Sequence, residues 1–152
     1  MKIKIRKTSS KDLDFTFFLR NENVARKNSI NSKKITLKNH KIWFKKKIND
    51  KNSLYFIVMS KDSQRIGIVR YDLKDIFAYV SINIKNEFRN LGYGSIMLKE
   101  TEKLIKKNLI LVANVKKSNV NSLKIFKKNK YILLKKAKQL ILVKIIKKVS
   151  ID

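Results

Sequence analysis

One stretch of this sequence decides its fold: residues 84–94, which read Ile84-Lys85-Asn86-Glu87-Phe88-Arg89-Asn90-Leu91-Gly92-Tyr93-Gly94. The stretch holds two of the chain's three glycines, in a sequence without proline. A strand-like run, residues 78–84, leads into it, and a helix-like run, residues 95–107, follows. Glycine permits the positive φ angles of a tight turn. The first N–H groups of the next helix lack intrahelical partners and carry the positive end of its dipole. The pattern therefore predicts a phosphate-binding loop, although a short glycine pattern is also compatible with a plain turn.

Length and composition favour a single folded domain. A chain of 152 residues, 43% hydrophobic, predicts a single domain over residues 1–152. The absence of cysteine excludes disulfides and thiolate metal sites, and the lone histidine, His40, argues against a histidine metal site, so we expect metal-free chemistry. No apolar run approaches a membrane span, and the first residues lack an apolar leader. We therefore expect a cytoplasmic protein without a membrane partner, monomeric or homodimeric.

The formal net charge of +27 invites a nucleic-acid interpretation. Lysine, however, supplies most of the basic residues and is spread from end to end, whereas phosphate and base recognition favours the planar fork of arginine. Abundant isoleucine and asparagine, with no proline, indicate a coding bias towards A+T. We therefore expect no specific nucleic-acid partner, and a positive field that attracts small anionic ligands.

Periodicity predicts an alternating chain. Strands are expected at residues 2–7, 54–59, 66–71, 78–84, 109–115, 131–134 and 139–146, and helices at residues 11–20, 36–48, 95–107 and 118–129. Residues between the first two helices are expected to form a polar loop.

Two segments carry a family resemblance. Residues 84–94 resemble the acetyl-CoA motif of the Gcn5-related N-acetyltransferases (GNAT family), in which a strand end and a glutamate–aromatic pair lead into R-x-x-G-x-G. Residues 119–131 resemble the family's N-x-x-[SA]-x-x-[LI]-[YF]-x-K-x-G-F segment, with Lys130-Tyr131 in place of Gly-Phe. The resemblance implies an α/β fold of the α+β type, with a mixed central sheet and helices on both faces. It also implies an acetyl-CoA-dependent N-acetyltransferase.

The resemblance assigns the cofactor site to three groups of residues. The diphosphate of coenzyme A would lie on the loop and the first helical turn, at Arg89, Asn90, Leu91, Gly92, Tyr93, Gly94 and Ser95. Pantetheine would lie along the backbone of Ile82, Asn83 and Ile84 and beside Asn119, Ser122 and Phe126. Asn119 equally suits an ordinary helix cap.

Two residues are catalytic candidates. Members of the family often use a tyrosine at the position of Phe126 as the acid for the leaving thiolate, and phenylalanine cannot donate a proton. Tyr131 is therefore the candidate acid or substrate hydrogen-bonder, unless it is a core aromatic residue. Ser81 could orient the amine or a relay water, or simply bond its neighbours. No carboxylate suggests itself as a base.

The first half of the chain suggests the acceptor. Its L-R-N and H-x-x-W-F segments resemble a family branch that acetylates nucleotide-linked 4-amino sugars in the pseudaminic acid pathway. That resemblance implies that Arg20 and Arg26 pair with the nucleotide diphosphate and that His40 and Trp43 contact the base or sugar, although His40 and Trp43 also suit a core. The expected acceptor is a UDP-linked 4-amino-4,6-dideoxy sugar. The alternatives are a ribosomal-protein or protein N-terminal acetyltransferase, and a basic nucleic-acid-binding module on a degenerate fold.

Overall fold

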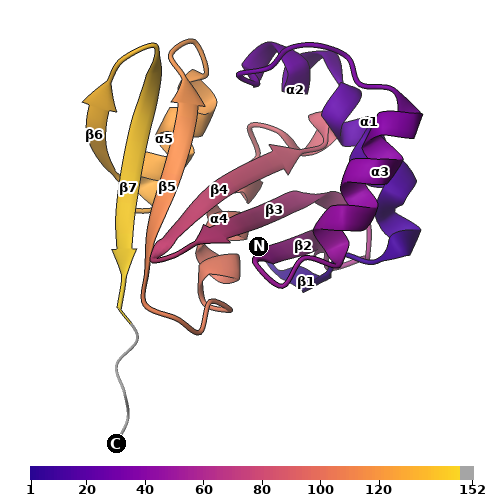
Figure 1. Ribbon diagram of the computed structural model, residues 1–152, viewed down its shortest axis with the longest axis horizontal. Coiled ribbons are helices and arrows are strands. Elements are labelled where there is room, and N and C mark those ends of the chain that lie inside the picture. Colours follow the sequence, from indigo (N-terminus) through magenta and orange to yellow (C-terminus); the bar gives the residue numbers. More distant parts are fainter. Residues whose placement is uncertain (148–152) are drawn as a thin grey trace, which may run out of the picture.

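The computed structural model describes residues 1–147 and forms one seven-stranded sheet with helices on both faces (Figure 1). The strand order is β1-β2-β3-β4-β5-β7-β6, and only β4 and β5 run parallel. The elements are β1 (Ile3–Lys7), η1 (Ser10–Asp12), α1 (Leu13–Asn21), α2 (Asn23–Asn28), α3 (Leu37–Ile48), β2 (Ser53–Ser60), β3 (Arg65–Lys74), β4 (Phe77–Ile84), η2 (Asn86–Phe88), α4 (Tyr93–Glu102), β5 (Leu109–Lys116), α5 (Val120–Lys128), β6 (Ile132–Lys136) and β7 (Gln139–Ile146). The predicted mixed-sheet fold is confirmed.

Two hydrophobic clusters fill the two faces of the sheet. On one face, α4 and α5 cover residues from β2 to β7, with Tyr71, Met97 and Leu111 fully buried. On the other face, α1 and α3 cover β2 and β3 around Leu19, Phe44 and Ile57. Because side chains alternate across a strand, the two faces receive alternate residues of each strand.

The seam between β4 and β5 is short. Only Phe77 to Tyr79 pair with Ile110 to Val112, and no later residue of β4 has a partner in β5. The two strands therefore separate beyond Tyr79. The backbone of Ser81 to Ile84 faces the gap on one side, while β3 pairs with it on the other.

The glycine loop begins α4. Gly92 is the N-cap, in the left-handed conformation with φ of 85°, and an added Cβ there would have no atom within 4 Å. Gly94 has a different role, because an added Cβ would lie 2.5 Å from Cδ1 of Ile125 and 3.0 Å from Cδ1 of Ile84. Gly92 thus permits the turn and leaves open space in front of it, whereas Gly94 lets α4 approach α5 and β4.

Several elements differ from the predictions, such as β3, which runs on to Lys74 rather than ending at residue 71. The predicted polar loop contains α2, which is only six residues long and too short to show a helical stripe. Helix α4 ends at Glu102 rather than at residue 107, because Glu102 turns inward to bond Tyr131 and the chain then leads into β5. Strand β6 runs on to Lys136. The predicted domain extends to residue 152, and residues 148–152 lie outside the described part of the chain.

Candidate active site

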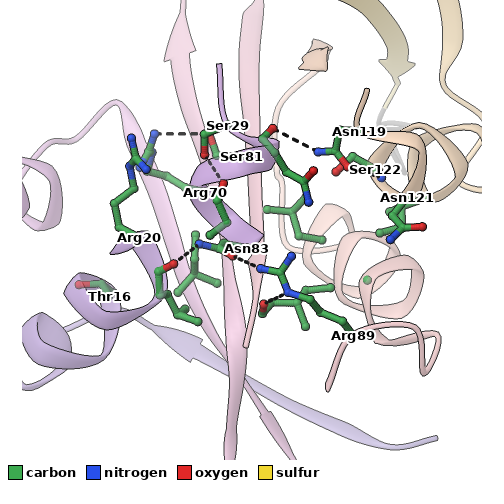
Figure 2. Close-up of a pocket in the computed structure, with 18 of the residues that line it drawn as sticks. Thr16, Arg20, Ser29, Arg70, Ser81, Asn83, Arg89, Asn119, Asn121 and Ser122 are labelled. Carbon is green, nitrogen blue, oxygen red and sulfur yellow. Dashed lines mark hydrogen bonds between the residues drawn. The ribbon is translucent and has the colours of Figure 1, made fainter. Parts of the chain in front are cut away.

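A cavity of about 780 Å³ opens where β4 separates from β5 (Figure 2). Its floor is the end of β4. The glycine loop, the start of α4 and one side of α5 form one half, and α1, α2, α3, β2 and β3 form the other. A volume of this size is typical of a ligand or cofactor site.

Most of the residues predicted to hold the cofactor line this cavity. They are Ile82, Asn83, Ile84, Arg89, Asn90, Gly92, Gly94, Ser95, Asn119 and Ser122. The first N–H groups of α4, which have no partners within the helix, therefore face a space that a phosphate can enter. Two lysines of α5, Lys124 and Lys128, also line the cavity and were not predicted. The sequence feature that could have indicated these two lysines is their spacing of four residues on the helix that Asn119 caps, because this spacing places both side chains on one face.

Three of the predicted cofactor residues do not line the cavity. Leu91 is 55% exposed, and the ring of Tyr93 packs edge-on against Phe88, which leaves only their backbone groups for the predicted role. Phe126 is buried in the core against Tyr131, with ring centroids 5.0 Å apart. The expectation that Phe126 contacts the cofactor is therefore wrong, because its side chain lies on the sheet-facing side of α5.

Asn119 has two bonding partners at the mouth of the cavity. Its Oδ1 caps α5 by accepting from the backbone N–H of Ser122 at 3.1 Å, so the cap interpretation holds. Its Nδ2 also donates to the carbonyl of Asn28 in α2 at 3.4 Å. A helix cap therefore also connects the cofactor side of the cavity to the acceptor side.

Arg89 connects the glycine loop to β4. Its Nε donates to the carbonyl of Ile84 at 2.9 Å, and its Nη2 donates to Oδ1 of Asn83 at 3.3 Å (Figure 2). The amide of Asn83 in turn donates to the carbonyl of Leu19 at 3.0 Å. Burial lowers the pKa of Arg89, while nearby Glu22 acts in the opposite direction. The guanidinium remains a cation at the edge of the cavity.

On the acceptor side, Arg20, His40 and Trp43 line the cavity, and Arg26 does not. The guanidinium of Arg26 donates to the carbonyl of Ser32 and to Asn23 on the exposed surface. One terminal nitrogen of Arg20 donates to the carbonyl of Asn31 at 2.8 Å. The other, Nη1, is buried without a hydrogen-bond partner in the described structure. Arg20 therefore lines the cavity with N–H donors that are still free to bind a ligand.

His40 is a buried, neutral imidazole. Its Nε2 lies 2.9 Å from Oγ1 of Thr16, and Thr16 donates its one proton to the carbonyl of Leu13. Thr16 must then accept from His40, so Nε2 carries the proton and Nδ1 is an acceptor. Burial lowers the pKa of His40, and the charge of Arg20 lowers it further.

A row of side chains that sequence reasoning missed crosses the sheet beneath α1 and α3. Tyr55, Arg70 and Ser81 stand opposite one another on β2, β3 and β4, and all three line the cavity. The Arg70 guanidinium lies 4.9 Å from the centroid of the Trp43 ring, and its Nη2 is 3.4 Å from Oγ of Ser81. Only the strand register brings these residues together, so no local pattern in the sequence reveals the row.

An ion pair with Asp72 holds the guanidinium of Arg70 in place. Its Nε donates to Oδ2 of Asp72 at 2.9 Å, and Lys47 bonds the other carboxylate oxygen at 2.7 Å. Burial alone would raise the pKa of Asp72, but Arg70 and Lys47 outweigh it and lower the pKa. Burial raises the pKa of Tyr55 to about 12, so that phenol stays protonated. The fixed charge facing the cavity is therefore positive.

Tyr131 lies outside the cavity, so the expectation that it acts as the acid there is wrong. Its side chain is buried in the core, and its hydroxyl donates to Oε1 of Glu102 at 2.9 Å. Lys144 pairs with the other oxygen of Glu102. Burial, followed by the charge of Glu102, raises the pKa of Tyr131. Tyr131 belongs to a structural network between α4 and β7.

The charged side chains that are described as lining the cavity are all positive. Within residues 1–147, no aspartate or glutamate is among the lining residues, whereas Arg20, Arg70, Arg89, Lys124 and Lys128 all are. The same part of the chain holds no group of three or more His, Asp or Glu side chains arranged to bind a metal ion. No helix in it is long and apolar enough to cross a membrane.

The sheet, its separated central strands and the glycine loop at the gap define a CoA-dependent acyltransferase of the α/β class. The family model described as "Acetyltransferase (GNAT) domain" matches residues 2–132. The chain belongs to the GNAT family and is an acetyl-CoA-dependent N-acetyltransferase. A comparison with curated protein sequences finds no match.

Solved structures agree with the fold. A domain from Methanocaldococcus jannaschii DSM 2661 has a TM-score of 0.79 at 19% identity, covering 95% of this chain and 99% of that one. Spermidine N-acetyltransferase from Vibrio cholerae, in complex with CoA and spermine, has a TM-score of 0.80 at 14% identity, with 95% and 94% covered. Aminoglycoside acetyltransferase AAC(6')-Ib in complex with coenzyme A and kanamycin has a TM-score of 0.80 at 11% identity, with 95% of each chain covered.

Proposed function

We propose that this enzyme transfers the acetyl group of acetyl-CoA to the primary amine of a nucleotide-linked amino sugar, such as a UDP-linked 4-amino-4,6-dideoxy sugar. One observation carries the proposal. The acceptor half of the cavity presents Arg20 and Arg70 beside Trp43, without any carboxylate among the described lining residues. Arginine forks bind phosphate oxygens in pairs, and an indole ring stacks on a base or a sugar.

The charge of the cavity argues against polycationic acceptors. The structures of similar fold include complexes with spermine and with kanamycin, which each carry several ammonium groups. A second ammonium group in this cavity would meet arginine and lysine rather than aspartate or glutamate. An acceptor whose remaining groups are anionic is the better complement.

Bound acetyl-CoA supplies the activated acetyl group. The N–H groups at the start of α4, with Arg89, would hold its diphosphate, and Lys124 and Lys128 would face its other phosphate. The unpaired edge of β4 from Ser81 to Ile84 would hold its pantetheine arm by backbone hydrogen bonds. Ser122 and Asn119 would lie across the gap from that arm.

The residues of this chain would assist the proton transfer by charge rather than through a carboxylate base. An amine must be neutral before it can attack a carbonyl group. Arg70, 3.4 Å from Oγ of Ser81, places a positive charge beside the centre of β4 and so lowers the pKa of an ammonium group bound there. The hydroxyl of Ser81 can then orient the amine or a relay water that carries the proton away, and Nδ1 of neutral His40 is a further acceptor in the same cavity.

The proposal is tested in two steps. Isothermal titration with acetyl-CoA measures donor binding, and thiol release with a UDP-4-amino sugar measures transfer. Replacing Arg20 by Gln should raise the acceptor KM at least tenfold, because the replacement removes a charge-assisted pair with phosphate. Arg26→Gln removes the same charge from the neighbouring helix, outside the cavity, and should change KM less than twofold. Preferred turnover of spermidine or kanamycin would contradict the proposal.

A further inference from the structure

Glu22 lies at the turn between α1 and α2 and reaches the glycine loop from the acceptor side. Its Oε1 accepts from the backbone N–H of Asn86 at 3.3 Å, and its Oε2 lies 3.9 Å from Nη2 of Arg89. The side chain is only 11% exposed, and Oε2 is buried without a hydrogen-bond partner in the described structure. Glu22 does not line the cavity, so the reaction itself gives no reason for its burial.

The position of Oε2 is energetically poor. A buried carboxylate oxygen is stable only when it is well paired or hydrogen-bonded. Within residues 1–147, the cation that pairs with Oε2 is Arg89, which stands at the long end of the ion-pair range and is already bonded to Asn83 and Ile84. The Glu22–Arg89 pair is therefore loose, and a better anion beside Arg89 can displace it.

Helix α2 begins directly after Glu22 and lines one side of the cavity. At its far end, the carbonyl of Lys27 accepts from Lys116, the last residue of β5, and the carbonyl of Asn28 accepts from Asn119, the N-cap of α5. Asn28 also lines the cavity. Glu22 thus joins one end of α2 to the glycine loop through Asn86, and Asn28 joins the other end to Asn119 at the start of α5.

We propose that Glu22 is a positioning residue that couples the cofactor loop to the acceptor side of the cavity. In the free protein it pairs with Arg89, and the diphosphate of coenzyme A competes with it for the same guanidinium. Binding of coenzyme A therefore weakens the hold on the first turn of α2. This inference rests on the proposed assignment of Arg89 to the cofactor.

The test needs only coenzyme A as its probe. Glu22→Gln keeps an oxygen that can accept from Asn86 but removes the competing charge, so CoA should bind about three- to tenfold more tightly. Glu87→Gln is the matched control: it removes the same charge from the glycine loop itself, but that side chain is 56% exposed and pairs with Lys85. The dissociation constant for the control should change less than twofold. Isothermal titration at low salt measures both.

Hydrogen exchange separates coupling from a merely structural role. In the wild type and in Glu87→Gln, CoA should speed amide exchange in residues 23–28. In Glu22→Gln, which keeps the bond to Asn86 but lacks the charge that the diphosphate displaces, CoA should leave the exchange rate of those amides unchanged. A structural role alone predicts the opposite sign for affinity, because a loosened loop binds CoA more weakly. Weaker binding by Glu22→Gln, or binding equal to that of Glu87→Gln, would overturn the inference, whereas failure of the wild type to bind CoA would instead refute the cofactor assignment.

Discussion

Replacing Gly92 by Asp tests the phosphate loop directly. The residue has φ of 85°, and an added Cβ would have no atom within 4 Å, so the substitution meets no steric obstacle. A side chain in the left-handed region costs about 1 kcal/mol in stability. The new carboxylate would project into the space at the start of α4, where we place the diphosphate.

Gly92→Asn is the matched control. Asparagine has nearly the same shape and tolerates the left-handed region at least as well as aspartate, so the backbone cost is shared and the charge alone differs. Two unit charges 4 Å apart repel by about 1 kcal/mol in water and about 4 kcal/mol near a protein surface. Since about 1.4 kcal/mol is a factor of ten, Gly92→Asp should bind acetyl-CoA at least tenfold more weakly than Gly92→Asn.

The assay is isothermal titration with acetyl-CoA at two salt concentrations, with circular dichroism to establish that both variants are folded. Raising the salt should narrow the gap between the variants, because it screens the repulsion. Equal affinities of folded Gly92→Asp and Gly92→Asn at low salt would refute the placement of the diphosphate on this loop.

Three further predictions concern the residues around the cavity and behind it. Arg70→Gln should move the rising limb of kcat for a UDP-4-amino sugar about half a pH unit higher, since the removed charge no longer lowers the pKa of the bound amine; an unshifted profile would rule out that role. Because burial lowers the pKa of His40, the unfolded chain takes up a proton there at higher pH than the folded protein, so stability is lost as the pH falls below about 6.5. Thermal melts from pH 7.5 to 5.5 should therefore show a steeper loss of Tm for the wild type than for His40→Gln, and parallel curves would count against a buried neutral imidazole. Tyr131→Phe should lower stability by about 1–2 kcal/mol, because Glu102 loses a buried hydrogen bond, yet change kcat less than twofold; a large fall in kcat in the folded variant would restore Tyr131 as the acid.

Local sequence patterns predicted the order of most elements and the position of the loop, and the resemblance to the GNAT family supplied the arrangement of the sheet. The change from period two to period 3.6 around Gly92 marks a strand, a turn and a helix, and these lie next to one another in the chain. The helix α2 escaped prediction because six residues are too few to show a stripe, and its stability depends on contacts at both ends.

Residues whose roles depend on tertiary register could not be predicted in the same way. Arg70 faces Ser81 only because β3 pairs with β4 in one particular register, and a slip of one residue would point it to the opposite face. The prediction that Phe126 contacts the cofactor is wrong for a related reason. Phe126 is one residue beyond Ile125, which lines the cavity, and is therefore rotated by about 100° around α5 into the core.

The short pairing between β4 and β5 has a consequence for the stability of the protein. Three residue pairs are all that join the two halves of the sheet directly, and the gap beyond them is where we place coenzyme A. A ligand that fills such a gap and binds only the folded state adds about 2.7 kcal/mol of stability when present at a hundred times its dissociation constant. The resistance of the protein to heat and to proteolysis would then rise with the concentration of coenzyme A.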